Sequence, residues 1–260
     1  MLLRLAKHTL GYDVAGPSDG TPVVLLHAFP LDRRMWEAQV ARRDVRTRMV
    51  TMDLLGLGES TREGSVDDAA DDVVALCDRL EIARAIVCGM SLGGYVALAF
   101  ARRHPDRLAG LLLADTRANP DDEAGRIARE EAITLVARNG VAHYASRLVS
   151  RLVTGRDANA LREATSMGET QTAIGMVGAL AALRDRPDAT PGLAAIAVPT
   201  TVLVGSEDTV TPPEVARALA AAIPGARYLE LEGAAHLSNL EKPREFSRAI
   251  DDLIARVTNK

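Results

Sequence analysis

A serine stands between two glycines in the stretch Gly89-Met90-Ser91-Leu92-Gly93. An apolar run, residues 85–88, precedes this stretch, and a helix-like apolar pattern follows it over residues 95–101. A G-x-S-x-G sequence between a strand and a helix is typical of a nucleophile elbow, a tight turn that lifts the serine hydroxyl above a sheet and favours glycine on both sides. The pattern therefore predicts that Ser91 is the nucleophile of a serine hydrolase.

A serine hydroxyl becomes an effective nucleophile when a base takes its proton and a carboxylate orients that base. Asp208 follows a predicted strand at residues 198–204, and His236 follows a predicted strand at residues 228–231. Each residue lies on the loop directly after its strand, and the order serine, acid, histidine is the order expected after a nucleophile elbow. We therefore predict a catalytic triad of Ser91, Asp208 and His236.

Hydrolysis of an acyl group also needs N–H donors for the oxyanion of the tetrahedral intermediate. The backbone N–H of Leu92, the residue after the nucleophile, is one predicted donor. The loop that follows the apolar run at residues 23–26 supplies the other, and there we predict Phe29, because Pro30 has no N–H. His27 in the same loop is expected to hold it through hydrogen bonds to the backbone, with no part in proton transfer.

Two further aspartates lie at the ends of predicted strands. Asp115 follows the apolar run at residues 108–114 and is the alternative triad acid, although the residues that flank Asp208 favour Asp208. Asp53 ends an earlier predicted strand and has the appearance of an active-site acid. We expect Asp53 instead to be structural and to tie down the glycine-containing turn that follows it.

Five side chains are candidates for contact with substrate: Trp36, Met90, Met176, Leu237 and Arg184. Leu237 stands directly beside the predicted base. Large apolar side chains and methionines also fill irregular gaps in a core, so core packing is the alternative for the four apolar candidates. The guanidinium group of Arg184 would bind a substrate carboxylate, and its alternative is an ordinary surface arginine.

Apolar runs alternate with helix-like patterns along most of the chain. Continuous apolar runs of this kind are typical of strands that are covered on both faces of a sheet. Strands that alternate with helices predict an α/β fold with a mostly parallel, doubly wound sheet. The predicted strands are residues 2–6, 9–14, 23–26, 48–53, 85–88, 108–114, 198–204 and 228–231, and the predicted helices include those that begin near Ser65, Pro212 and Pro243.

Residues 118–195 interrupt this alternation with helix-like stripes and no strand pattern. One stripe comprises Val141, Ala145, Leu148, Val149 and Leu152, and another comprises Ile174, Val177, Gly178, Ala181 and Ala182. A crossover between parallel strands needs only about a dozen residues. The length therefore favours a helical lid inserted into a core formed by residues 1–117 and 196–260, with ordinary crossover packing as the alternative.

Composition excludes several classes of protein. Hydrophobic residues make up 47% and charged residues 25%, an ordinary globular balance, and the net charge of −4 argues against binding to nucleic acid or an anionic membrane. Cys77 and Cys88 lie in apolar segments and are expected to be buried free thiols. With no signal-peptide or membrane-span pattern, we expect a cytoplasmic monomer or homodimer that uses no metal and no cofactor.

Over essentially its whole length the chain resembles the α/β-hydrolase family, and within it the lid-bearing 3-oxoadipate enol-lactonases. The resemblance rests on the elbow and on residues 27–30, 53–60, 205–212 and 234–239. Related carboxylesterases, methyl-ester hydrolases and cofactor-free perhydrolases share these motifs. The resemblance implies hydrolysis of a carboxylic ester or small lactone through an acyl-enzyme. The family usually has glycine at the position of Ala28, so the oxyanion loop requires an ordinary φ angle there.

Other activities are compatible with the same residues. A C–C bond hydrolase and a cofactor-free perhydrolase or haloperoxidase of this fold would use the same triad. A ligand-binding or receptor protein of the fold, which is a different class, would keep the architecture with negligible turnover. Labelling of Ser91 together with an ester assay distinguishes the receptor from the enzymes.

Overall fold

The computed structural model describes residues 1–259 and contains one eight-stranded sheet with the strand order β1-β2-β4-β3-β5-β6-β7-β8. The first two strands pair antiparallel with their neighbours, and every pairing from β4 to β8 is parallel. The predicted α/β class with a mostly parallel sheet is therefore confirmed. The strands are β1 (Leu2–Arg4), β2 (Thr9–Ala15), β3 (Thr21–Leu26), β4 (Thr47–Met52), β5 (Ala85–Met90), β6 (Leu108–Ala114), β7 (Thr200–Gly205) and β8 (Arg227–Leu231).

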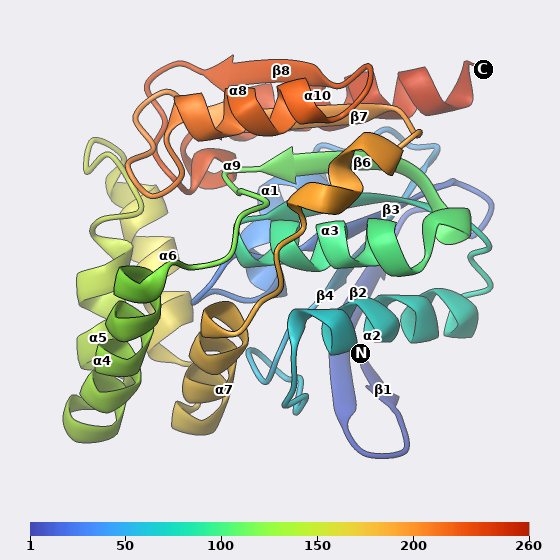
Figure 1. The fold of residues 1–260 in the computed structure, drawn as a ribbon. Helices are drawn as coiled ribbons and strands as arrows, with labels where there is room; N and C mark the ends of the chain where they lie inside the picture. The colour runs from blue at the N-terminus through green and yellow to red at the C-terminus, as the bar shows by residue number, and fades with distance from the viewer. Residues whose placement is uncertain (260) are drawn as a thin grey trace.

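Helices cover both faces of the sheet (Figure 1). Helices α2, α3 and α8 pack on one face, and α10 and the short α1 pack on the other. The helices of this core are α1 (Glu37–Ala41), α2 (Val66–Arg79), α3 (Leu92–Arg103), α8 (Pro213–Ala222), α9 (Ser238–Glu241) and α10 (Pro243–Thr258), with short 3₁₀ helices η1 (Arg33–Trp36) and η2 (Pro105–Arg107).

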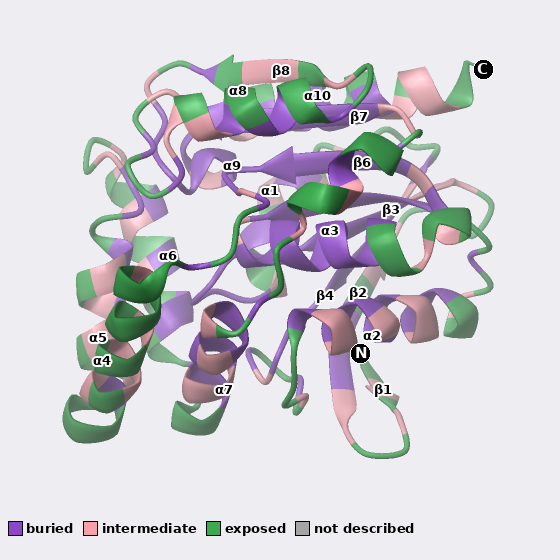
Figure 2. Ribbon diagram, viewed as in Figure 1, coloured by how far each residue is buried: buried purple, intermediate pink, exposed green. Residues whose placement is uncertain are grey.

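The continuous apolar runs fill two cores, one on each face of the sheet. In β3, Val24 and Leu26 point into the core beneath α2 and α3, whereas Val23 and Leu25 point into the core beneath α10. This alternation follows from the two-residue period of a strand. All four side chains are buried, and the central strands are buried along their length (Figure 2). The sheet is therefore a rigid platform for the loops at its edge.

Local signals set the helix boundaries. Ser65 caps α2 as predicted: its hydroxyl accepts the N–H of Asp68, and the Asp68 carboxylate accepts the N–H of Ser65. This reciprocal pair satisfies two N–H groups that would otherwise lack a partner at the helix end. Pro243 begins α10, where its missing N–H costs nothing.

Four helices and one 3₁₀ helix lie between β6 and β7: α4 (Glu123–Asn139), α5 (Val141–Val149), α6 (Ala158–Glu169), α7 (Ala173–Arg184) and η3 (Thr190–Ala195). We call α4 to α7 the inserted helices. They lie at one end of the sheet, beyond the carboxyl ends of the strands (Figure 1). The Gln171 amide group before α7 donates to Asp32 after β3 and accepts the N–H of Gly58 after β4. These contacts join the inserted helices to the loops at that edge.

The predicted apolar stripe on α7 is only partly buried. Ala182 is buried as predicted, but Ile174 is 72% exposed, and the other buried apolar side chains of the helix are Met176, Ala179, Leu180 and Leu183. Helix α7 has apolar residues around most of its circumference, so periodicity does not select one side of it. Residues 33–41, where no strand or helix was predicted, form η1 and α1, which are too short for a clear period. No helix within residues 1–259 is long and apolar enough to cross a membrane.

Candidate active site

Ser91 follows β5 at a strained turn that begins α3. Its backbone angles are φ 51° and ψ −109°, and its N–H donates to the carbonyl of Ala114 at 2.9 Å. A Cβ on Gly89 would lie 2.1 Å from the Gly93 carbonyl oxygen, and a Cβ on Gly93 would lie 2.0 Å from that of Leu26. Both glycines are therefore required by close backbone contacts, which explains the G-x-S-x-G spacing.

The structure brings Ser91, His236 and Asp208 together from three separate loops. The Ser91 hydroxyl lies 2.8 Å from His236 Nε2, and His236 Nδ1 lies 2.7 Å from Asp208 Oδ2. With Nδ1 protonated, Nε2 is free to accept from the serine, so the hydrogen-bond pattern assigns this tautomer. His236 and Asp208 are both 2% exposed, whereas Ser91 is half-buried. The serine is therefore the member of the three that is open to solvent.

The Asp208 carboxylate accepts four hydrogen bonds. Its Oδ1 accepts the N–H groups of Val210 at 2.7 Å and Thr211 at 3.0 Å, and its Oδ2 accepts the Thr211 hydroxyl at 2.6 Å in addition to His236. Burial alone would raise the pKa of Asp208, but the charge of His236 and the hydrogen bonds from His236 and Thr211 outweigh it and lower that pKa. Asp208 is therefore ionised and fixed in orientation.

Two backbone N–H groups beside Ser91 have no protein acceptor. Across residues 1–259 neither Leu92 N–H nor Phe29 N–H makes a hydrogen bond to the chain. The Gly93 N–H donates to the His27 carbonyl at 3.0 Å and so joins the elbow to the loop that carries Phe29. Leu92 is also the first residue of α3, where the helix dipole favours negative charge.

Ala28 stands where relatives usually have glycine, and the structure accommodates it. Residues other than glycine with positive φ in the described chain are Leu55, Glu81, Ser91 and Asp115. Ala28 is not among them, so its methyl group imposes no strain on the loop. The Ala28 carbonyl also accepts the N–H of Leu31 at 2.9 Å, which closes a turn around the cis peptide bond Phe29–Pro30.

His27 holds the same loop, as the sequence predicts. Its Nε2 accepts the N–H of Leu54 at 2.8 Å, and its Nδ1 donates to the Ala28 carbonyl at 3.0 Å. Burial lowers the pKa of His27, against the opposing effect of the Asp53 charge. The imidazole is therefore neutral and bridges the loops after β3 and β4.

Asp53 fixes the turn after β4. Its carboxylate accepts the backbone N–H groups of Arg33 and Glu59 at 2.9 and 2.8 Å, and it pairs with the Arg33 guanidinium group. A Cβ on Gly58 would lie 2.3 Å from the carboxyl group, so the glycine is needed for the turn to close over it. These contacts agree with the structural role expected for Asp53.

Asp115 does not contact the predicted base. Its Oδ1 accepts the N–H of Gly205 at 2.8 Å, and its Oδ2 lies 2.5 Å from the Ser238 hydroxyl oxygen. His236 Nδ1 pairs with Asp208, so the geometry favours Asp208 over Asp115 as the orienting acid.

The loop that carries His236 is tied to the inserted helices. The Glu241 carboxylate accepts the N–H of Thr154 at 2.8 Å and the N–H of Ala235 at 2.7 Å. One residue beyond His236, the Leu237 N–H donates to the Leu152 carbonyl at 2.9 Å. Residues 152–154 lie between α5 and α6, so the inserted helices help to hold the histidine loop.

The four apolar candidates for substrate contact lie in the core. Trp36, Met90, Met176 and Leu237 are each 0% exposed. The Trp36 ring packs against Phe246 of α10, with 5.6 Å between ring centroids. Side chains with essentially no surface open to water fill the core, and their burial agrees with the core-packing alternative.

The contacts of Arg184 agree with its alternative, a surface arginine. Its guanidinium group pairs with Glu130 of α4 and with Asp185, whose carboxylate oxygens lie 3.0 and 2.5 Å from Arg184 Nε and Nη2. Acidic side chains of the protein itself therefore occupy both ends of the Arg184 guanidinium group. Arg184 is therefore part of a surface ion-pair network at the end of α7.

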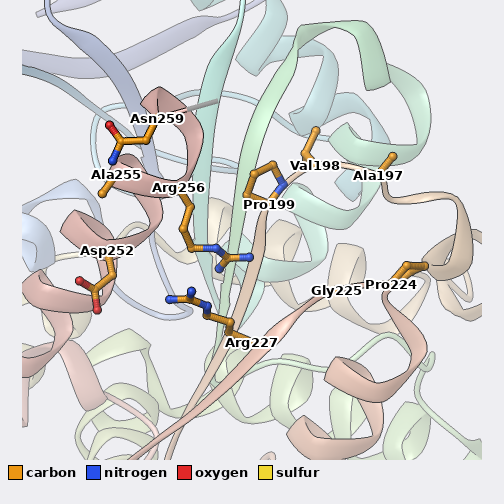
Figure 3. Close-up of a pocket in the computed structure, with 10 residues that line it drawn as sticks. All are labelled: Ala197, Val198, Pro199, Pro224, Gly225, Arg227, Asp252, Ala255, Arg256 and Asn259. Atoms are coloured by element: carbon orange, nitrogen blue, oxygen red, sulfur yellow. The ribbon is translucent and has the colours of Figure 1, made fainter.

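Two cavities in the structure differ in their distance from the candidate active site. A cavity of about 810 Å³ lies between α4 and α5, and one of its lining residues, Tyr144, packs its ring 6.3 Å from that of Phe29. A second cavity, of about 630 Å³, lies beneath Pro199 and Arg227 at the amino ends of β7 and β8, where Arg227 faces Arg256 (Figure 3). Ligands of parallel sheets bind at the carboxyl ends of the strands, so the first cavity is the one near the candidate site.

Thr211 and Glu241 support the site but were not predicted. Thr211 was detectable, because a residue three positions after an aspartate at the end of a strand commonly closes an Asx-type turn on it. Glu241 carries no such local signal, since its partners Thr154 and Ala235 come from other segments. Within residues 1–259 no group of three or more His, Cys, Asp or Glu side chains is placed to hold a metal ion.

Comparisons with known proteins match the chain to one family. Residues 21–243 match the model of the family described as alpha/beta hydrolase fold. The chain is 29% identical over 264 residues to 3-oxoadipate enol-lactonase 1 of Acinetobacter baylyi, and the aligned region covers 99% of this chain and 97% of that relative. It is 36% identical to a thermophilic esterase from Thermogutta terrifontis, with a TM-score of 0.91 over 96% of this chain and 94% of that one. The enol-lactonase from Burkholderia xenovorans is 29% identical, with a TM-score of 0.90 over 98% and 100% of the two chains. Together with the fold and the arrangement around Ser91, these matches show that the chain belongs to the α/β-hydrolase family.

Proposed function

We propose that this protein hydrolyses a carboxylic ester or a small lactone through an acyl-enzyme on Ser91. The observation that carries the proposal is the continuous hydrogen-bonded chain from Ser91 Oγ through His236 to Asp208, at 2.8 and 2.7 Å. The relatives compared above are esterases and enol-lactonases, and the chain is accordingly a hydrolase of ester bonds. The acyl-enzyme route and the roles of the individual residues are part of the proposal.

In the first step, Ser91 Oγ attacks the acyl carbon while His236 Nε2 takes its proton. The negative charge of Asp208 stabilises the imidazolium ion that results, and its hydrogen bond to Nδ1 keeps Nε2 aimed at the serine. The carbonyl oxygen of the substrate becomes an oxyanion. The free N–H groups of Leu92 and Phe29 donate to it, and such donors lower the barrier by about 3–4 kcal/mol each.

Collapse of the tetrahedral intermediate breaks the ester bond. His236 Nε2 passes its proton to the leaving oxygen, and the acyl group remains on Ser91. In the second half-reaction a water gives its proton to the same Nε2 and attacks the acyl carbon, and Ser91 leaves with the proton returned. Every proton in this scheme moves through His236, and no added cofactor is required for any step.

The inserted helices would act as a lid over this chemistry. They contact the loops after β3 and β4 through Gln171 and the loop after β8 through Leu152. Tyr144, one of the residues that line the 810 Å³ cavity, packs its ring 6.3 Å from that of Phe29, and the cavity is of a size that suits a small ligand. We infer that part of the substrate occupies this cavity.

Replacement of the nucleophile tests the mechanism. Ser91→Ala is expected to lower kcat on an aryl acetate by about 10⁴-fold or more, because the triad acts as a unit. Ser91 should also be the residue labelled by a fluorophosphonate in the wild type. Ser18→Ala, at an exposed turn, is the matched control and should keep full activity. A tenth of the wild-type rate in Ser91→Ala would contradict the mechanism.

A substrate panel separates the related activities. It contains simple esters, 3-oxoadipate enol-lactone, a vinylogous diketone, and acetate with hydrogen peroxide. Highest kcat/KM on an ester or lactone supports the proposal. Highest kcat/KM on the diketone or on peracid formation identifies the C–C hydrolase or the perhydrolase, and labelling of Ser91 without turnover identifies a binding protein.

A further inference from the structure

Asp115 is a fully buried acidic residue that the proposed mechanism does not use. It follows β6, is 0% exposed, and has a φ of 47°, in the left-handed region that is uncommon for residues other than glycine. The edge of the sheet thus contains a second buried carboxyl group beside the one that pairs with His236. Such a group is costly to keep unless it contributes something specific.

The two oxygens of Asp115 contact two different loops. Oδ1 accepts the N–H of Gly205 at 2.8 Å, and Gly205 in turn accepts the N–H of Asp208 on its carbonyl at 3.1 Å. Oδ2 lies 2.5 Å from the hydroxyl of Ser238, two residues after His236. Asp115 therefore links the loop that carries Asp208 to the loop that carries His236.

No cation balances Asp115. Within residues 1–259 no Arg, Lys or His side chain lies within ion-pair distance of it, whereas the buried Asp53 and Asp121 are each paired with arginine. The ionisable group beside it is Asp208, on the loop after β7, and Asp208 in turn pairs with His236. Burial and then the charge of Asp208 raise the pKa of Asp115 well above its usual value, despite the hydrogen bonds from Ser238 and Gly205.

We propose that Asp115 is a positioning residue that is uncharged at neutral pH and that, as a carboxylic acid, ties the loops of Asp208 and His236 together. This inference rests on the proposed function. The uncharged state leaves a single negative charge beneath the imidazole. A second charge there would hold the proton on His236 too strongly for its transfer to the leaving oxygen, since a base works best when its affinity for the proton is intermediate.

The test compares Asp115→Asn with Asp115→Ala. An asparagine amide accepts from Gly205 and donates to Ser238 Oγ, so it reproduces the uncharged acid, and we expect kcat/KM within about threefold of the wild type. Asp115→Ala removes both contacts. We expect its kcat to fall about 10²-fold with KM unchanged, the cost of a small displacement of catalytic groups. Loss of activity in Asp115→Asn as large as in Asp115→Ala would overturn the proposal.

The pH profile supplies a readout that a purely structural role would not change. If Asp115 is uncharged, the acid limb of kcat/KM in Asp115→Asn shifts by less than about half a pH unit. Removal of a real negative charge near His236 would move that limb down by about one unit or more, and this result would refute the proposal.

A stability measurement works without any substrate. Because the folded-state pKa of Asp115 is raised, its contribution to stability is complete below the unfolded value and is lost as the pH rises through the folded value. The Tm of Asp115→Asn minus that of the wild type should therefore increase from pH 4 to pH 8. A difference that stays constant or decreases would overturn the inference. An inactive wild type with this pH trend would instead reject the proposed function alone.

Asp53→Asn is the matched control for these melts. It makes the same substitution at a buried aspartate whose charge is paired with Arg33. We expect it to lower the Tm at pH 7, because the guanidinium group loses its partner, whereas Asp115→Asn does not lower it. Equal losses in the two variants would contradict an uncharged Asp115.

Discussion

Asp208→Asn gives the sharpest test of how the proposed base is oriented. The asparagine oxygen would keep the bonds from the N–H groups of Val210 and Thr211, which now go to Oδ1. The amide NH₂ would then take the place of Oδ2 and face two donors, His236 Nδ1–H and the Thr211 hydroxyl. An NH₂ group cannot accept either bond.

The favoured tautomer of the imidazole then has an unprotonated Nδ1 facing the amide NH₂. The ring proton therefore lies on Nε2. That nitrogen, 2.8 Å from Ser91 Oγ, can then no longer accept the serine proton. Loss of the correct tautomer costs about 10⁴-fold in kcat, or about 5.5 kcal/mol at 1.36 kcal/mol for each factor of ten. KM should change little, because no substrate contact is lost.

Steady-state hydrolysis of an aryl acetate and the rate of fluorophosphonate labelling of Ser91 measure this effect together. Asp19→Asn, at an exposed loop, is the control and should match the wild type. The reasoning fails if Asp208→Asn keeps a tenth of the wild-type kcat, or if Asp115→Asn proves the more severe of the two, in which case Asp115 is the orienting acid.

Three further predictions follow from the contacts around the site. Gly93→Ala places a Cβ 2.0 Å from the Leu26 carbonyl oxygen, so we expect a loss of about 3 kcal/mol or more in the free energy of unfolding by urea; a loss below about 1 kcal/mol would contradict the close contact. His27→Ala leaves the buried Leu54 N–H without an acceptor and should cost about 1–3 kcal/mol and lower kcat, whereas unchanged stability would show that the loop is held otherwise. Burial raises the pKa of Cys88, so its thiol should react with a disulfide reagent only after denaturation, and rapid labelling of the native protein would contradict its burial.

The arrangement of the triad could be predicted because each of its members has a local signal. Ser91 stands in a glycine-flanked turn, and Asp208 and His236 each follow an apolar run that is a strand of the parallel sheet. The topology of such a sheet then places all three loops at one edge. The proposed oxyanion donor could be named from the same kind of signal, since Pro30 has no N–H and the N–H of Phe29 beside it has no acceptor in the described chain.

The lining of the cavity proposed for the substrate could not be predicted, because it depends on how helices rotate against each other. Met176 and Trp36 have the residue types of a pocket and lie in the core, whereas Tyr144, which lines the cavity near Phe29, was not singled out. The uniform apolarity of α7 concealed its buried face. The pairings of Asp115, and that of Glu241 with Thr154, join segments far apart in the sequence and leave no trace in either segment alone.

The bonds from Glu241 to Thr154 and Ala235, and from Leu237 to Leu152, make the segment between α5 and α6 part of the frame that carries the imidazole. A substrate that displaced that segment would therefore also displace His236, the base in the proposed mechanism. We therefore expect substrate selectivity to depend on the alignment of His236 with Ser91 as well as on the shape of the substrate. A substrate that pushes this segment outward would be turned over slowly even when it binds tightly.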